Sequence, residues 1–206
     1  HLEIGYEIAS AQSYAGEIDK AEERLKNIIE NREIYPELKA KCLNLLGIIE
    51  AHYRNNVKTA VNYFKDALEI YSNEQMALKE AQVTKNIGNV YYMEGNYTDA
   101  EVYWSKSLNK NLEIGNLEEE ATLLNNYGVL FFKNLDLEKA IENYRRALSI
   151  YKSLGRRFGE GLGYSNLGET YYYASEYDEA LLCLDRAKII FQEIGDFGEV
   201  CEVLLL

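Results

Sequence analysis

Small and large apolar residues alternate with polar ones in a pattern that returns every forty residues. Four alanines mark this period, and a large residue follows each alanine after four positions and a second small residue after seven. Positions i, i+4 and i+7 lie on one face of an α-helix, so each copy predicts a helix with one buried face. The three sets are Ala60, Ala100, Ala140 and Ala180; Phe64, Trp104, Tyr144 and Leu184; and Ala67, Ser107, Ala147 and Ala187.

A second helix is predicted before each of these. Its marks are Gly47, Gly88, Gly128 and Gly168, and in the last three copies an aromatic residue three positions later. Turn-forming residues separate the two helices, so each copy is read as an antiparallel pair that buries its apolar face only by stacking on its neighbours. The glycines Gly115, Gly155 and Gly195 are expected to cap the second helices. A degenerate earlier copy contains Ala9, Ala21 and Leu25.

The residues of the last copy resemble the tetratricopeptide repeat. That family's pattern is met by Tyr164, Leu167-Gly168, Tyr171, Ala180, Leu184 and Ala187. The resemblance implies an all-α fold, a right-handed superhelical solenoid of antiparallel helix pairs, with about five repeats plus a terminal helix. The usual repeat has about 34 residues and a proline that closes the second helix, whereas this chain repeats every forty without that proline. The added residues are expected to lengthen the second helix and the loop after it.

We expect residues 1–206 to form a single solenoid of this kind. The expected repeats span residues 2–34, 36–73, 77–115, 117–155 and 157–195, with a partial one at 197–206. The turn at Arg54-Asn55-Asn56 is expected to carry one extra residue, because Gly47 precedes Ala60 by one residue more than in later copies. The apolar end Val200–Leu206 suggests a fragment of a longer protein, or self-association through this C-terminal helix.

Composition narrows the classes of partner. The 206 residues carry a net charge of −12, which argues against nucleic-acid binding by this fragment, because phosphate contacts need a footprint of lysine and arginine. The longest apolar stretches are too short to span a membrane. The three cysteines, Cys42, Cys183 and Cys201, lack metal-ligand spacing and are expected to be buried reduced thiols, which favours a cytoplasmic location.

An asparagine stands two residues before the glycine in three copies, at Asn86, Asn126 and Asn166. The stacked repeats are expected to align these side chains in a row along the concave groove. A carboxamide both donates and accepts, so the row suits the backbone of an extended peptide, and in tetratricopeptide domains this position commonly contacts one. The alternative is that the asparagines are small polar residues on a wet face, or form hydrogen bonds within the stack to the next repeat.

Aromatic residues follow one turn later and are expected either to anchor apolar ligand groups or to pack between repeats. The candidate peptide-binding residues are Lys85, Asn86, Asn89, Tyr92, Asn125, Asn126, Phe132, Lys133, Asn166, Glu169, Tyr172 and Tyr173. Lys85, Asn89 and Asn126 also match three places of the clamp with which some tetratricopeptide domains hold a C-terminal carboxylate. Leu162 and Asn166 stand where its last two cations belong, so capture of an acidic tail is not expected.

No catalytic, cofactor-binding or metal-binding residues are predicted. His1 is terminal, and His52 lacks cysteine or carboxylate neighbours at metal-ligand spacing. The glycine-rich stretch 159–163 lacks the lysine of a phosphate-binding loop and is expected to pack closely within a helix. We therefore expect a binding module rather than an enzyme.

Within that class the repeats resemble two groups. One is the bacterial peptide receptors of the Rap and PlcR-like kind, which would make this chain the sensor domain of a peptide-responsive regulator. The other is the eukaryotic adaptors similar to kinesin light chains and Leu-Gly-Asn-repeat scaffolds. A structural solenoid that binds a folded partner or itself remains the alternative.

Overall fold

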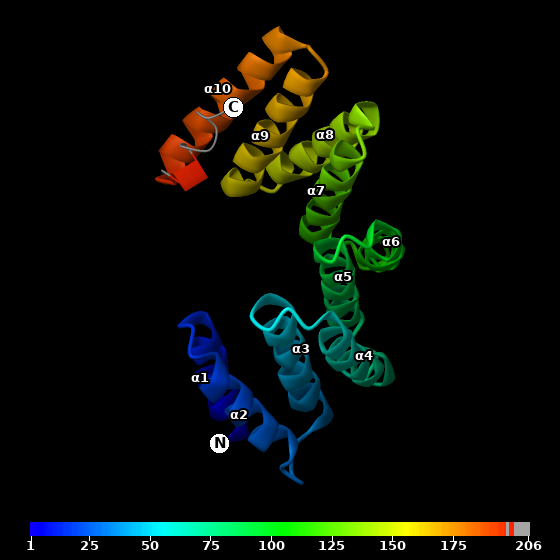
Figure 1. The fold of residues 1–206 in the computed structure, drawn as a ribbon, viewed down its shortest axis with the longest axis vertical. Coiled ribbons are helices and arrows are strands. Elements are labelled where there is room, and N and C mark those ends of the chain that lie inside the picture. Colours follow the sequence, from blue (N-terminus) through cyan, green and yellow to red (C-terminus); the bar gives the residue numbers. More distant parts are fainter. Residues whose placement is uncertain (197, 200–206) are drawn as a thin grey trace. The chain divides into compact units, whose positions relative to one another are not determined.

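The computed structural model describes residues 1–196, 198 and 199, and within them all regular structure is α-helical (Figure 1). The chain divides into two compact units, the first from His1 to Ile114 and the second beginning at Gly115. The helices of the first unit are α1 (Leu2–Tyr14), α2 (Ile18–Ile29), α3 (Pro36–His52), α4 (Val57–Asn73), α5 (Ala77–Met93) and α6 (Tyr97–Ile114). Those of the second unit are α7 (Leu117–Lys133), α8 (Leu137–Ser153), α9 (Arg157–Tyr173) and α10 (Tyr177–Ile194).

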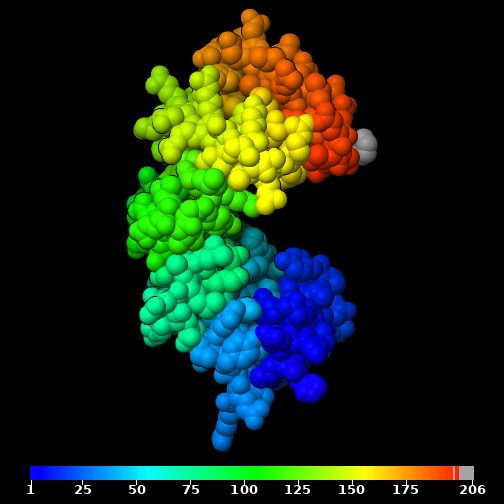
Figure 2. Space-filling model, turned by 180° about the vertical axis from the view of Figure 1, so that it is seen from behind, coloured from blue at the N-terminus to red at the C-terminus, as the bar shows by residue number. Residues whose placement is uncertain are grey.

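Each unit is built from helix pairs joined by short turns, α1 with α2, α3 with α4 and α5 with α6 in the first, and α7 with α8 and α9 with α10 in the second. Within each unit consecutive segments occupy adjacent bands of the surface, as repeats that contact their sequence neighbours should (Figure 2). This arrangement confirms the all-α fold of stacked helix pairs that the forty-residue period predicts. Each pair also falls inside one of the five expected repeat ranges.

The close approach inside each pair comes from the predicted glycines. A Cβ added to Gly88 would lie less than 3.0 Å from the Trp104 indole, and one added to Gly128 equally close to the Tyr144 ring. Gly47 meets Phe64 and Gly168 meets Leu184 in the same way. The glycine therefore provides the space in the first helix that the large residue of the second helix fills.

The small residues of the second helices are buried as predicted. Ala60, Ala100, Ala140 and Ala180 and the second set Ala67, Ser107, Ala147 and Ala187 are all at most 2% exposed. Ser107 is the polar member, and its hydroxyl donates to the backbone carbonyl of Ala81 at 2.8 Å. These contacts let neighbouring helices pack at short distance around clusters of buried residues within each unit.

Left-handed backbone ends several helices. Gly115, Gly155 and Gly195 have φ of 70°, 65° and 76°, which agrees with the predicted caps. Glycine adopts this left-handed conformation without steric cost because it has no Cβ. Leu135 has φ of 60° at the position where the preceding repeat has Gly95. The turn 53–56 contains one residue more than the turn 94–96, as expected.

Two expectations stay predictions. The single solenoid over residues 1–206 is untested, because the two units are described separately. The partial repeat 197–206, with the self-association expected of it, lies outside the described residues apart from residues 198 and 199. No helix of the described part is both long and apolar enough to cross a membrane.

Candidate functional site

In the first unit the predicted asparagine of α5 joins two repeats. The side chain of Asn86 donates from Nδ2 to Oδ1 of Asn44 on α3 at 3.0 Å, and both residues are partly exposed. Asn44 is missing from the candidates that the sequence provides. The signal that could have found it is its place three residues before Gly47, which matches the place of Asn125 before Gly128.

The second unit repeats the arrangement. Nδ2 of Asn166 on α9 donates to Oδ1 of Asn125 on α7 at 2.8 Å. Asn125 is only 8% exposed, whereas Asn166 is partly exposed. Of the two alternatives for the predicted row, the hydrogen bond between repeats is thus found for both Asn86 and Asn166. Asn126 lies on α7 beside Asn125 and is also partly exposed.

The shared geometry leaves part of each amide unused by the pair. A carboxamide has two N–H groups and an oxygen with two lone pairs, and each bond between repeats takes one N–H from one side chain and one lone pair from the other. The bond also fixes the orientation of the amide planes. Asn166, the more exposed partner, can offer its Oδ1 and second N–H to a ligand without losing the bond to Asn125.

An aromatic contact lies two helical turns beyond the Asn125–Asn166 bond. Phe132 is seven residues after Asn125, Tyr173 is seven after Asn166, and their rings meet edge to face at a centroid distance of 5.2 Å. The two helices are thus joined twice, once by amides and once by rings. We call the surface of α7 and α9 that bears Asn125, Asn166, Phe132, Tyr172 and Tyr173 the amide face.

Two rings of the amide face are largely open. Tyr172 is 53% exposed and Tyr173 58% exposed, and the two rings stand almost perpendicular, at 86°. Tyr172 also contacts Tyr177 at the start of α10. Lys133 ends α7 and is exposed. Exposed aromatic rings held by ring contacts are suited to contact a ligand, since little conformational freedom is left to lose.

Glu169 stands on α9 one turn before these two tyrosines. It is partly buried, and burial raises the pKa of its carboxyl above the usual value. Among the described residues it has no hydrogen-bond or ion-pair partner. A carboxylate that is partly desolvated and unpaired favours a cation beside it.

Two of the remaining candidates of the first unit take part in packing. The indole Nε1 of Trp104 donates to Oδ1 of Asn89 at 2.9 Å, and Tyr92 packs its ring on Trp104 and on Tyr97. Asn89 and Tyr92 therefore support the α5–α6 contact. Lys85 is partly exposed beside Asn86. In the second unit, Leu162 of α9 offers no cation at its place in the carboxylate clamp.

Other reactive groups are held in packing roles. Burial raises the pKa of the Cys42 thiol to about 12 and also raises the pKa of the Cys183 thiol, so both thiols are protonated at neutral pH. Cys201 lies outside the described residues. His52 is exposed at the end of α3. The described residues contain no group of three metal-ligating side chains. The glycines of 159–163 lie within α9, and at Gly159 and Gly161 an added Cβ would meet the Tyr151 and Phe191 rings.

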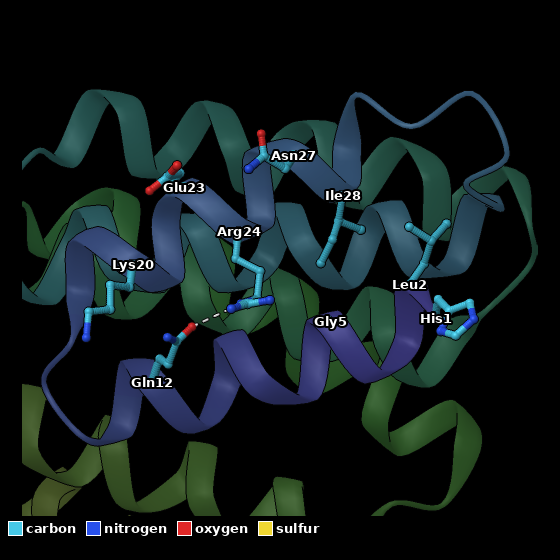
Figure 3. A pocket seen from close by; sticks show the side chains of 9 residues that line it. All are labelled: His1, Leu2, Gly5, Gln12, Lys20, Glu23, Arg24, Asn27 and Ile28. Atoms are coloured by element: carbon cyan, nitrogen blue, oxygen red, sulfur yellow. Dashed lines mark hydrogen bonds between the residues drawn. The ribbon is translucent and has the colours of Figure 1, made fainter.

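A separate hollow of about 420 Å³ opens between α1 and α2 (Figure 3). Arg24 crosses it and donates to Oε1 of Gln12 at 3.2 Å, with Lys20 and Glu23 on the same wall. Its lining mixes both signs of charge. It lies on the first helix pair, whereas the Asn44–Asn86 bond joins the second and third pairs.

The chain matches known repeats both in sequence and in structure. Two family models, each described as tetratricopeptide repeat, match residues 79–153 and 163–194, which together make up just over half of the chain. No curated protein matches the sequence. The crystal structure of BtubC (BKLC) from P. vanneervenii is 24% identical with a TM-score of 0.78, over 91% of this chain and 78% of that one.

Two Rap structures share the fold at lower identity. The apo form of RapI is 17% identical with a TM-score of 0.86, over 98% of this chain and 74% of its own. The Rap conjugation gene regulator of the plasmid pLS20, solved in complex with the Phr* peptide, is 17% identical with a TM-score of 0.79, over 98% of this chain and 56% of its own. These likenesses concern the fold. The matched family models, in agreement with the stacked helix pairs, show that the chain belongs to the tetratricopeptide-repeat family.

Proposed function

We propose that this chain is a protein-binding module that holds an extended peptide segment along the first helix of each repeat. The amide face of the second unit is one binding site for such a segment. The observation that carries the proposal is the Asn125–Asn166 pair. It presents an oriented, partly exposed carboxamide between two repeats, and donors and acceptors fixed in this way can bond a peptide backbone without reading its sequence. The exposed rings of Tyr172 and Tyr173 supply neighbouring contacts for side chains.

The similar fold of a Rap regulator solved with the Phr* peptide supports this choice. If this chain works as part of a similar regulator, it is the sensor domain of a bacterial peptide-responsive regulator. The fold and the amide pairs both support binding as the activity of this chain.

Native mass spectrometry with an unbiased pool of capped peptides tests the proposal. We would compare the parent with the Asn126→Ala/Asn166→Ala double variant at a temperature where both remain folded by circular dichroism. The matched control is Asn62→Ala/Asn109→Ala, which removes two exposed carboxamides from the second helices α4 and α6. Peptides retained by parent and control but lost from the first variant support Asn126 and Asn166 as part of the binding site.

The other results are equally decisive. Equal retention by all three proteins would refute a ligand role for the asparagines. No retention by the parent would refute peptide binding and favour the alternative, a scaffold that binds a folded partner or itself. The two bonds between repeats are the observation that favours this second function, because they give the asparagines a structural task. A molecular mass that rises with concentration in light scattering would identify self-association.

A further inference from the structure

The side of α9 that bears Glu169 carries chemistry that the backbone contacts of an extended peptide do not use. Glu169, Tyr172 and Tyr173 are spaced i, i+3 and i+4, so their side chains share one helix face with Cβ atoms about 5–6 Å apart. The two tyrosine rings meet almost at right angles, and each tyrosine is more than half exposed. The result is a corner of two aromatic rings with a carboxylate one turn away.

The carboxylate lacks a partner inside the described part of the chain. Its partial burial removes water that would otherwise solvate the negative charge, and no cation in the described residues replaces that water. In the same helix pair, Asp178 and Glu179 are exposed in the first turn of α10, directly after the Tyr177 ring that contacts Tyr172. The charges that follow the Tyr177 ring are therefore negative, in a chain with a net charge of −12, whereas Lys133 follows the Phe132 ring that contacts Tyr173.

A basic side chain satisfies both features at once. An ammonium or guanidinium group is attracted to the face of an aromatic ring, and it forms a charge-assisted hydrogen bond with a carboxylate. An apolar side chain would contact the rings but leave Glu169 desolvated and unpaired, and an acidic one would be repelled.

We propose that Glu169, Tyr172 and Tyr173 form a recognition site for a lysine or arginine side chain of a peptide that lies on the amide face. This inference rests on the peptide-binding function proposed above and adds the charge of the residue that the module selects. The site belongs to α9 alone, one turn from the carboxamide of Asn166 that would hold the peptide backbone.

The test uses pentapeptide pools that are N-acetylated and C-amidated, so that the fixed central residue is their only designed charge. Four pools carry arginine, lysine, citrulline or glutamate at the centre, and their flanking positions omit charged residues. Citrulline matches arginine in shape but is neutral. Retention of each pool by the full chain is measured by native mass spectrometry at equal total peptide concentration.

We expect the parent to retain the arginine pool about tenfold more than the citrulline pool, since a cation–π contact and a charge-assisted bond are both lost with the charge. Glu169→Gln, which keeps the shape of the side chain, should reduce this preference to less than about threefold. Glu142→Gln on α8 removes the same charge from an exposed site and should leave the preference unchanged. Tyr173→Leu should weaken retention of both cationic pools.

Three results would overturn the inference. Retention of all pools without preference for arginine or lysine would refute it while the peptide-binding function stands. A preference that survives in Glu169→Gln would place the selecting group elsewhere and refute it as well. If the parent retains no pool at all, the proposed function itself fails and the inference fails with it. Thermal melting of each variant shows whether a loss of binding reflects a loss of fold.

Discussion

Removal of the Asn166 side chain is the sharpest test of the bond between repeats. Asn166→Ala deletes the donor to Oδ1 of Asn125, and Asn125 is 8% exposed, so water has little access to the oxygen that loses its partner. An unpaired buried acceptor costs about 1–3 kcal/mol. Asn125→Ala leaves the unpaired group on the more exposed Asn166, where water can replace the bond, and should cost about 0.5–1.5 kcal/mol.

A double-mutant cycle isolates the bond from other effects of the two truncations. We expect Asn125→Ala/Asn166→Ala to cost less than the sum of the single variants by about 0.5–1.5 kcal/mol, because the second truncation has no bond left to break. Urea unfolding followed by circular dichroism gives the free energies. Thermal melting should show about 2–4 °C per kcal/mol for a chain of this size. Additive costs would refute a stabilising bond between Asn125 and Asn166. The control is Asn62→Ala, an exposed truncation on α4, which should change the free energy of unfolding by less than about 0.5 kcal/mol.

Three further predictions concern packing, backbone and charge. Gly128→Ala should lower the free energy of unfolding by about 1–3 kcal/mol in urea, because the new Cβ would overlap the Tyr144 ring; an unchanged midpoint would contradict the close approach. Leu135→Gly should raise it by about 0.5 kcal/mol, since Leu135 is 74% exposed and has φ of 60° where the equivalent Gly95 has 83°; a lower melting temperature would contradict this. Burial raises the folded-state pKa of Glu169 above its unfolded value, so its stabilising contribution is present at acidic pH and is lost as the pH rises through the folded-state pKa. Glu169→Gln should therefore raise the melting temperature at pH 7 by more than at pH 4, and a gain independent of pH would contradict it.

The fold could be predicted from the sequence because the residues that pack together are small and large side chains that recur at fixed positions of each repeat. Gly88 with Trp104 and Gly128 with Tyr144 are pairs of the smallest and largest side chains at matching positions, and the structure brings each pair into contact. Four copies in one register leave little freedom in how the helices pair. The left-handed conformation of Leu135 was not predictable in the same way, because the sequence there shows an ordinary leucine and only the turn geometry demands a positive φ.

The candidate site was only partly predictable, for a reason that lies in helix geometry. A side chain that faces the preceding repeat cannot also face the following one, so equivalent residues of successive repeats do not bond to each other. The bonds run diagonally, from Asn86 to Asn44 across 42 residues and from Asn166 to Asn125 across 41. A period of forty aligns Asn86, Asn126 and Asn166 and so conceals Asn44, whose own position in the repeat is one residue earlier.

The same diagonal bond changes which residue best reports a ligand. Asn166 takes part in the stack, so its truncation should weaken both the fold and any peptide contact, and the two losses must be separated by measuring stability beside binding. Glu169 stands one turn away with no partner among the described residues, and burial makes its charge unfavourable in the absence of a ligand. Glu169→Gln should therefore stabilise the free chain while it weakens the binding of a cationic peptide. Opposite changes in stability and binding from one substitution cannot arise from a loss of fold, which makes Glu169 the residue on which the proposed site for a basic side chain is best decided.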